Sequence, residues 1–125
     1  MAVTGQQVFD MAMTLIDEVS ETGNIVIENP GYYKAKALTF LTTLQTELIP
    51  LDQSPVIQTD LSQYLLVSDR IALLVLPYGL AAHLLLIDDP NSASFFNDRY
   101  EELKRKQQTR SQPITDVYGV NGFNG

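Results

Sequence analysis

The stretch that decides the fold is Ile71–Ile87, IALLVLPYGLAAHLLLI, which contains 17 residues and no formal charge. A helix that is apolar nearly all round either forms the centre of a bundle or spans a membrane. A span needs about 17–25 residues, so this stretch is at the lower limit. Pro77, Gly79 and His83 interrupt it, and no cluster of positive charges flanks either end. We therefore predict a buried central helix and no membrane association.

Pro77 and Gly79 are the unusual residues of this helix. Proline in a helix interior costs about 3 kcal/mol or more, because it removes a hydrogen bond and crowds a carbonyl. Glycine adds about 1 kcal/mol relative to alanine. The pair predicts either a kink or a new helix that begins at Pro77 after a turn. Such a bend either lets the helix pack or shapes a surface for a neighbouring subunit. In the second case Pro77, Tyr78 and Gly79 are the candidate interface residues.

The first helix is predicted to begin at Thr4. Thr4 and Gln7 form the capping box T-x-x-Q, in which a hydroxyl and an amide satisfy two unpaired backbone N–H groups. Gly23 can take the left-handed conformation that closes such a helix, and Asn24–Glu28 then forms an extended connector. The apolar stripe of this helix recurs at helical spacing at Val8, Met11, Ala12, Leu15, Ile16 and Val19.

A second helix is predicted from Pro30 to about Ile49. Asn29 is its N-cap, Pro30 occupies the first helical position, and Pro50 stops it. Its expected buried residues are Tyr33, Ala37, Leu41, Leu44 and Leu48. Residues 51–67 mix polar residues with short apolar pieces and predict an irregular loop. Loops of this length within a compact domain are often used for contacts.

A fourth helix follows the central one. Asp89 as N-cap and Pro90 as the first helical residue start it, and Asp88 and Asp89 suit this helix start better than the preceding C-terminus. The helix carries Ala93, Phe95, Phe96, Tyr100 and Leu103, and ends with the basic cluster Lys104, Arg105, Lys106 and Arg110. One member of each aromatic pair, Tyr32-Tyr33 and Phe95-Phe96, is expected to be buried. Overall the sequence predicts an all-α, small four-helix bundle-like domain over residues 1–110 and a flexible C-terminal tail over residues 111–125.

The composition excludes several functions. A chain of 125 residues fits one domain, and its lack of cysteine excludes disulfides, thiolate metal sites and a cysteine nucleophile. Residues 1–90 carry 11 acidic and 3 basic side chains, whereas residues 91–125 carry 4 and 5. Because an acidic body repels phosphate, long contacts with DNA are not expected. We interpret the basic cluster as a complement to the dipole at a helix C-terminus.

The sequence offers no catalytic, cofactor-binding or metal-binding residues. His83 is the only histidine, and Gly79 and Ile87, four residues to either side, cannot act with it as ligands. No G-x-S-x-G elbow, phosphate-binding glycine loop or calcium loop is present. We therefore interpret His83 as structural, and expect a chain that is not an enzyme and needs no cofactor.

The second half of the chain resembles a known family. Leu76–Leu84, LPYGLAAHL, is followed by Asp89-Pro90 and then by Ala93–Leu103, ASFFNDRYEEL. This pattern is similar to the head–tail connector (adaptor, head-completion) proteins of tailed bacteriophages and prophages, and Ile114–Gly119 resembles their C-terminal segment. The resemblance covers residues 69–119 best. The first half agrees only in being helical and acidic.

The resemblance implies a structural virion protein. Such proteins form a homo-oligomeric ring beneath the portal protein, contact a tail-side completion protein, and let DNA pass without sequence-specific binding. The implied location is the head–tail interface of the virion, after assembly in the host cytoplasm. The tail residues Val117, Tyr118 and Phe123 are then expected to order against a neighbouring subunit. The alternative from the residues alone is a generic cytosolic helical protein-interaction module that uses the loop at 51–67.

Overall fold

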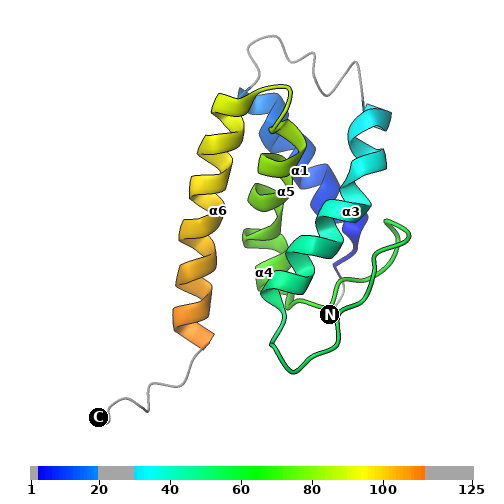
Figure 1. Ribbon diagram of the computed structural model, residues 1–125, viewed down its shortest axis with the longest axis vertical. Coiled ribbons are helices and arrows are strands. Elements are labelled where there is room, and N and C mark those ends of the chain that lie inside the picture. The colour runs from blue at the N-terminus through cyan, green and yellow to red at the C-terminus, as the bar shows by residue number, and fades with distance from the viewer. Residues whose placement is uncertain (1–2, 20–29, 112–125) are drawn as a thin grey trace.

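The computed structural model describes residues 3–19 and 30–111, and within these ranges the chain is all-α, with five helices and no strand. In chain order the helices are α1 (Gly5–Val19), α3 (Pro30–Leu48), α4 (Asp69–Leu74), α5 (Leu76–Leu85) and α6 (Pro90–Ser111). Figure 1 shows α5 in the middle, α6 and α3 on its two sides, and α1 behind it. The predicted all-α bundle with a long loop before the apolar helix is confirmed.

The apolar stretch forms two helices rather than one. Ser68 caps α4, its Oγ accepting from Ile71 N at 3.3 Å, and the chain turns at Val75 before Pro77 occupies the first turn of α5. Eight of the ten residues of α5 are buried, which confirms its central position. The ends of the predicted helix are not buried, however. Leu73, Leu74, Leu86 and Ile87 are all exposed. The buried central helix is therefore shorter than the uncharged stretch.

The helix starts predicted at Thr4 and Asp89 are present as hydrogen bonds, whereas Asn29, the predicted N-cap of α3, lies outside the described residues. Gln7 N donates to Thr4 Oγ1 at 3.3 Å, and Thr4 N donates to Gln7 Oε1 at 2.9 Å, which completes the capping box. At α6, Ser92 N donates to Asp89 Oδ1 at 3.2 Å. Asp88 has a separate role, because its Oδ2 accepts from Tyr33 OH at 2.5 Å and so ties the turn before α6 to α3.

The core follows the predicted stripes with a few corrections. On α1, Met11 is exposed, and Phe9 and Met13 are buried instead. On α3 the expected residues are buried, except that Leu48 is only half-buried. Tyr33 and Phe96 are the buried members of their aromatic pairs, as predicted, whereas Tyr32 and Phe95 are exposed. The buried apolar residues of α6 are Ala93, Phe96, Tyr100 and Leu103.

The loop at 51–67 is irregular, as predicted, but it is held to the helices by many hydrogen bonds. Residues 3–6 run along its second limb: Leu65 N donates to Val3 O at 3.0 Å, and Gln6 N donates to Leu61 O at 2.7 Å. The buried carboxamide of Gln45 on α3 then joins both limbs. Its Nε2 donates to the carbonyl of residue 56 at 3.3 Å, and its Oε1 accepts from the N–H of residue 66 at 2.6 Å.

Gln58 in this loop is buried, and neither its Nε2 nor its Oε1 has a hydrogen-bond partner among the described residues. Because an unsatisfied buried amide is costly, we expect Gln58→Leu to raise the free energy of unfolding by about 1 kcal/mol. Urea unfolding of the two proteins measures this. The control is Gln53→Leu at an exposed position of the same loop, where a change within about 0.5 kcal/mol is expected. A less stable Gln58→Leu protein would contradict the prediction.

Candidate interaction surfaces

The predicted interface residues at the start of α5 lie mostly inside the domain. Pro77 and Gly79 are buried, so they present no surface to a partner, and that part of the prediction is wrong. A Cβ at Gly79 would lie 2.8 Å from two ring atoms of Tyr100 and 3.1 Å from a methyl group of Leu44. Glycine is therefore required here by the close approach of α5 to its neighbours. Tyr78 is half-buried and remains a candidate.

The other three predicted interface residues, Val117, Tyr118 and Phe123, lie outside the described residues. The same holds for most of the predicted tail, although Ser111 belongs to α6.

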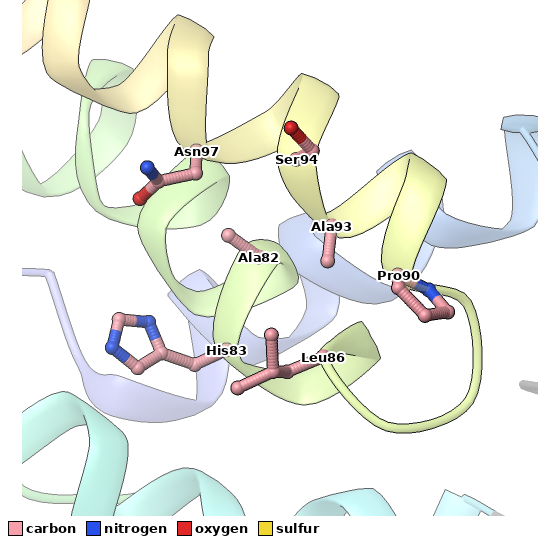
Figure 2. A pocket seen from close by; sticks show the side chains of 7 residues that line it. All are labelled: Ala82, His83, Leu86, Pro90, Ala93, Ser94 and Asn97. Atoms are coloured by element: carbon pink, nitrogen blue, oxygen red, sulfur yellow. The ribbon is translucent and has the colours of Figure 1, made fainter.

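A groove of about 300 Å³ lies between α5 and the first half of α6. Its lining residues are Ala82, His83, Leu86, Pro90, Ala93, Ser94 and Asn97. Figure 2 shows Ala82 and Ala93 between the two helices, with Asn97 on α6 and the His83 side chain on α5 lying apart from each other. The short alanine side chains leave the groove open, and His83 is the only ionisable residue among those that line it.

His83 is uncharged at neutral pH, and its ring lies beside Phe40 of α3, with the two ring centroids 5.2 Å apart. Its Nδ1 lies 3.0 Å from Gly79 O. Because a carbonyl oxygen only accepts, Nδ1 carries the proton and Nε2 has the free lone pair. Burial lowers the pKa of His83, and the negative charge of Glu47 only partly offsets this effect. No three His, Asp or Glu side chains gather as a metal site in the described ranges.

We expect the free energy of unfolding to fall as the pH drops below about 6.5, partly because of His83. The unfolded histidine has a pKa of about 6.5, whereas the folded one lies lower. The unfolded state therefore binds more protons in this range, so this contribution is present above pH 6.5 and is lost as the pH falls through the folded pKa. His83→Gln does not titrate and should show a shallower slope in urea unfolding at a series of pH values. Identical slopes would contradict this role.

A polar clamp, formed by Glu47, Tyr100 and Lys104, joins α3 to α6. Tyr100 OH donates to Glu47 Oε1 at 2.7 Å, and Lys104 Nζ donates to Glu47 Oε2 at 2.6 Å. Burial raises the pKa of the Glu47 carboxyl, but these hydrogen bonds outweigh it and hold the pKa below its usual value. Lys104 also lies 3.1 Å from Glu101. Lys104 thus pairs with carboxylates, and α6 continues beyond it to Ser111. The interpretation of the basic cluster as a complement to the dipole at a helix C-terminus is therefore wrong for Lys104.

Exposed apolar side chains occur at both ends of the bundle. The loop group comprises Leu51, Val56, Ile57, Tyr64, Leu73 and Leu74, and the turn group comprises Leu86, Ile87 and Phe95. Figure 1 places the loop and α4 at the end opposite to the turn between α5 and α6. The sequence predicted that the loop at 51–67 is used for contacts, but it did not single out these exposed residues. The only sequence signal was the short apolar pieces within a polar loop.

No protein-family model, curated protein or solved structure matches this chain. No helix within residues 3–19 and 30–111 is both long and apolar enough to cross a bilayer. The function is therefore inferred from the surfaces described above and from the resemblance of the sequence.

Proposed function

We propose that the chain is a head–tail connector subunit of a tailed bacteriophage, which docks as a ring beneath the portal and links the DNA-filled head to the tail. One observation carries this proposal. The two runs that bear the resemblance, Leu76–Leu84 and Ala93–Leu103, pack on each other as the α5–α6 hairpin, and Gly79 of the first contacts Tyr100 of the second. The similar residues therefore specify one structural unit rather than an isolated short match.

The surface is also suited to a ring subunit. A ring needs two different surfaces on each subunit, because its contacts are head-to-tail rather than self-complementary. The loop group and the turn group lie at opposite ends of the bundle and supply two such apolar surfaces. The excess of acidic residues over residues 1–90 disfavours adhesion to DNA, as a conduit requires. On this proposal the protein is located in the virion and is assembled in the host cytoplasm.

Electron microscopy of the purified chain mixed with the portal ring encoded beside its gene tests the proposal. An additional ring of density on one face of the portal is expected. A chain truncated after Ser111, which lacks Val117, Tyr118 and Phe123, should dock more weakly if the tail orders against a neighbour. A full chain that leaves the portal unchanged at high concentration would refute the connector function.

The second candidate is a helical protein-interaction module of the cytosol. The loop group favours it, because Leu51 and Ile57 are among the most exposed large apolar side chains of the described residues. The two functions differ in what they require. A module binds its partner as a single chain, whereas a connector subunit forms a ring on the portal. Sizing of the chain with and without portal separates them.

A further inference from the structure

We propose that Ser54–Thr59 is an open strand edge that binds an extended apolar segment of another protein by backbone pairing. The inference goes beyond the connector function and does not depend on it, since it concerns a single chain and one peptide segment.

The backbone of this segment has the alternation of a strand. On one side, Val56 O accepts from Gln45 Nε2 at 3.3 Å, and Gln58 N donates to Thr42 Oγ1 at 2.8 Å, so residues 56 and 58 face α3. On the other side, Ile57 O and the N–H of residue 59 make their own hydrogen bonds, described next. Backbone groups that point to opposite sides at successive residues are typical of extended chain.

Gln63 covers part of the outer edge in the way that a neighbouring strand would. Its Nε2 donates to Ile57 O at 3.4 Å, and its Oε1 accepts from Thr59 N at 3.0 Å. A carboxamide offers the same donor and acceptor as a peptide group. In a parallel strand, the N–H and the C=O of one residue would bond the same two partners, the carbonyl of one residue and the N–H two residues later. Gln63 therefore imitates one residue of a strand that runs parallel to Ser54–Thr59.

The next such pair along the edge is Pro55 O and Ile57 N–H, and neither makes a hydrogen bond within the described part of the chain. Both residues are exposed. A partner strand that continues the row begun by Gln63 would bond these two groups, and it would gain further pairs if it displaced the Gln63 carboxamide. Main-chain pairing of this kind supplies affinity in many peptide-binding proteins.

The side chains indicate the partner's chemistry. Val56 is 40% exposed and Ile57 is 70% exposed, so apolar side chains on the partner would cover both. Asp52 is exposed just before the segment, and residues 50–67 contain no lysine or arginine. In a parallel arrangement the N-terminal end of the partner lies toward Asp52. The expected partner segment is therefore extended and apolar, with lysine or arginine before the apolar run.

The test uses the full chain and a fluorescently labelled peptide, Lys-Lys-Val-Thr-Val-Thr-Val-Thr. Fluorescence anisotropy should show saturable binding, and hydrogen exchange of the Ile57 N–H should slow when the peptide is present. A peptide N-methylated at its central residues loses the backbone donors and should bind about two- to tenfold more weakly for each hydrogen bond lost. A peptide with Asp-Asp in place of Lys-Lys should also bind more weakly.

Two matched variants of the protein complete the test. Ile57→Pro removes the N–H at an exposed position and should weaken binding, whereas Ile57→Val keeps the N–H and should bind as the parent does. Gln63→Ala frees Ile57 O and Thr59 N and should bind more tightly, a result that general apolar adhesion would not give. Circular dichroism checks that each variant is folded. Equal binding of the N-methylated peptide, or no saturable binding of the parent peptide at millimolar concentration, would overturn the proposal.

Discussion

Replacing Gly79 by valine is expected to lower the free energy of unfolding by about 3 kcal/mol, as overpacking of a tight core does. A Cβ at this position would lie 2.8 Å from Cδ1 and Cε1 of Tyr100. The ring of Tyr100 is 2% exposed, and its hydroxyl is bonded to Glu47, so it cannot move aside without breaking the clamp. Urea unfolding followed by circular dichroism measures the loss.

The control for this substitution is Gly31→Ala. Gly31 lies in the first turn of α3, and a Cβ there would meet nothing within 4 Å. Alanine should leave stability unchanged or raise it by up to about 1 kcal/mol. Combining Gly79→Val with Tyr100→Leu should cost less than the two single changes together, because the residues are in contact. A Gly79→Val protein as stable as the parent would show that α5 and α6 do not approach each other closely.

Replacing Gln45 by leucine is expected to cost about 2–4 kcal/mol, since it leaves two polar backbone groups without their partner. Gln45 is fully buried, and its carboxamide bonds both Val56 O and Leu66 N. Leucine is of similar size, so the loss reports the hydrogen bonds rather than a cavity. The loop at 51–67 should also become sensitive to proteolysis, because this carboxamide joins both of its limbs to α3.

The matched control is Thr46→Leu, the next residue along α3, whose side chain is exposed. Its stability should change by no more than about 0.5 kcal/mol, and its loop should resist proteolysis as the parent's does. Equal stability of the Gln45→Leu and Thr46→Leu proteins would mean that the loop is not held through Gln45.

The parts of the fold that could be predicted from the sequence are those set by residues close together in the chain. The capping box of Thr4 and Gln7 and the cap at Asp89 each involve residues three apart, and both are present. The new helix near Pro77, one of two alternatives, could likewise be predicted from the sequence, because proline fits the first turn of a helix. The exposure of Met11 and Leu73 could not be predicted, because a stripe of apolar residues does not indicate how much of it a neighbouring helix covers.

The candidate surfaces were harder to predict, because they depend on distant pairs. Tyr100 and Glu47 are 53 residues apart, and Leu66 and Gln45 are 21 apart. A glutamine in a helix carries no local sign that it will bond a loop backbone. Gly79 was correctly singled out as unusual, yet the cause was a buried contact with Tyr100 rather than a surface. The sequence indicated that the residue is constrained but not what constrains it.

Two of the contacts that α3 makes differ in kind, and they therefore respond differently to pH and to salt. The loop is held by the neutral carboxamide of Gln45, which neither titrates nor responds to ionic strength. In contrast, the contact between α3 and α6 depends on ionised Glu47. The lowered pKa of Glu47 gives stability that is present above the pKa of the unfolded state and lost as the pH falls through that of the folded state. Strong acid, or concentrated salt that screens Lys104 from Glu47, therefore weakens the contact between α3 and α6, while α6 stays packed on α5 and the loop stays attached to α3.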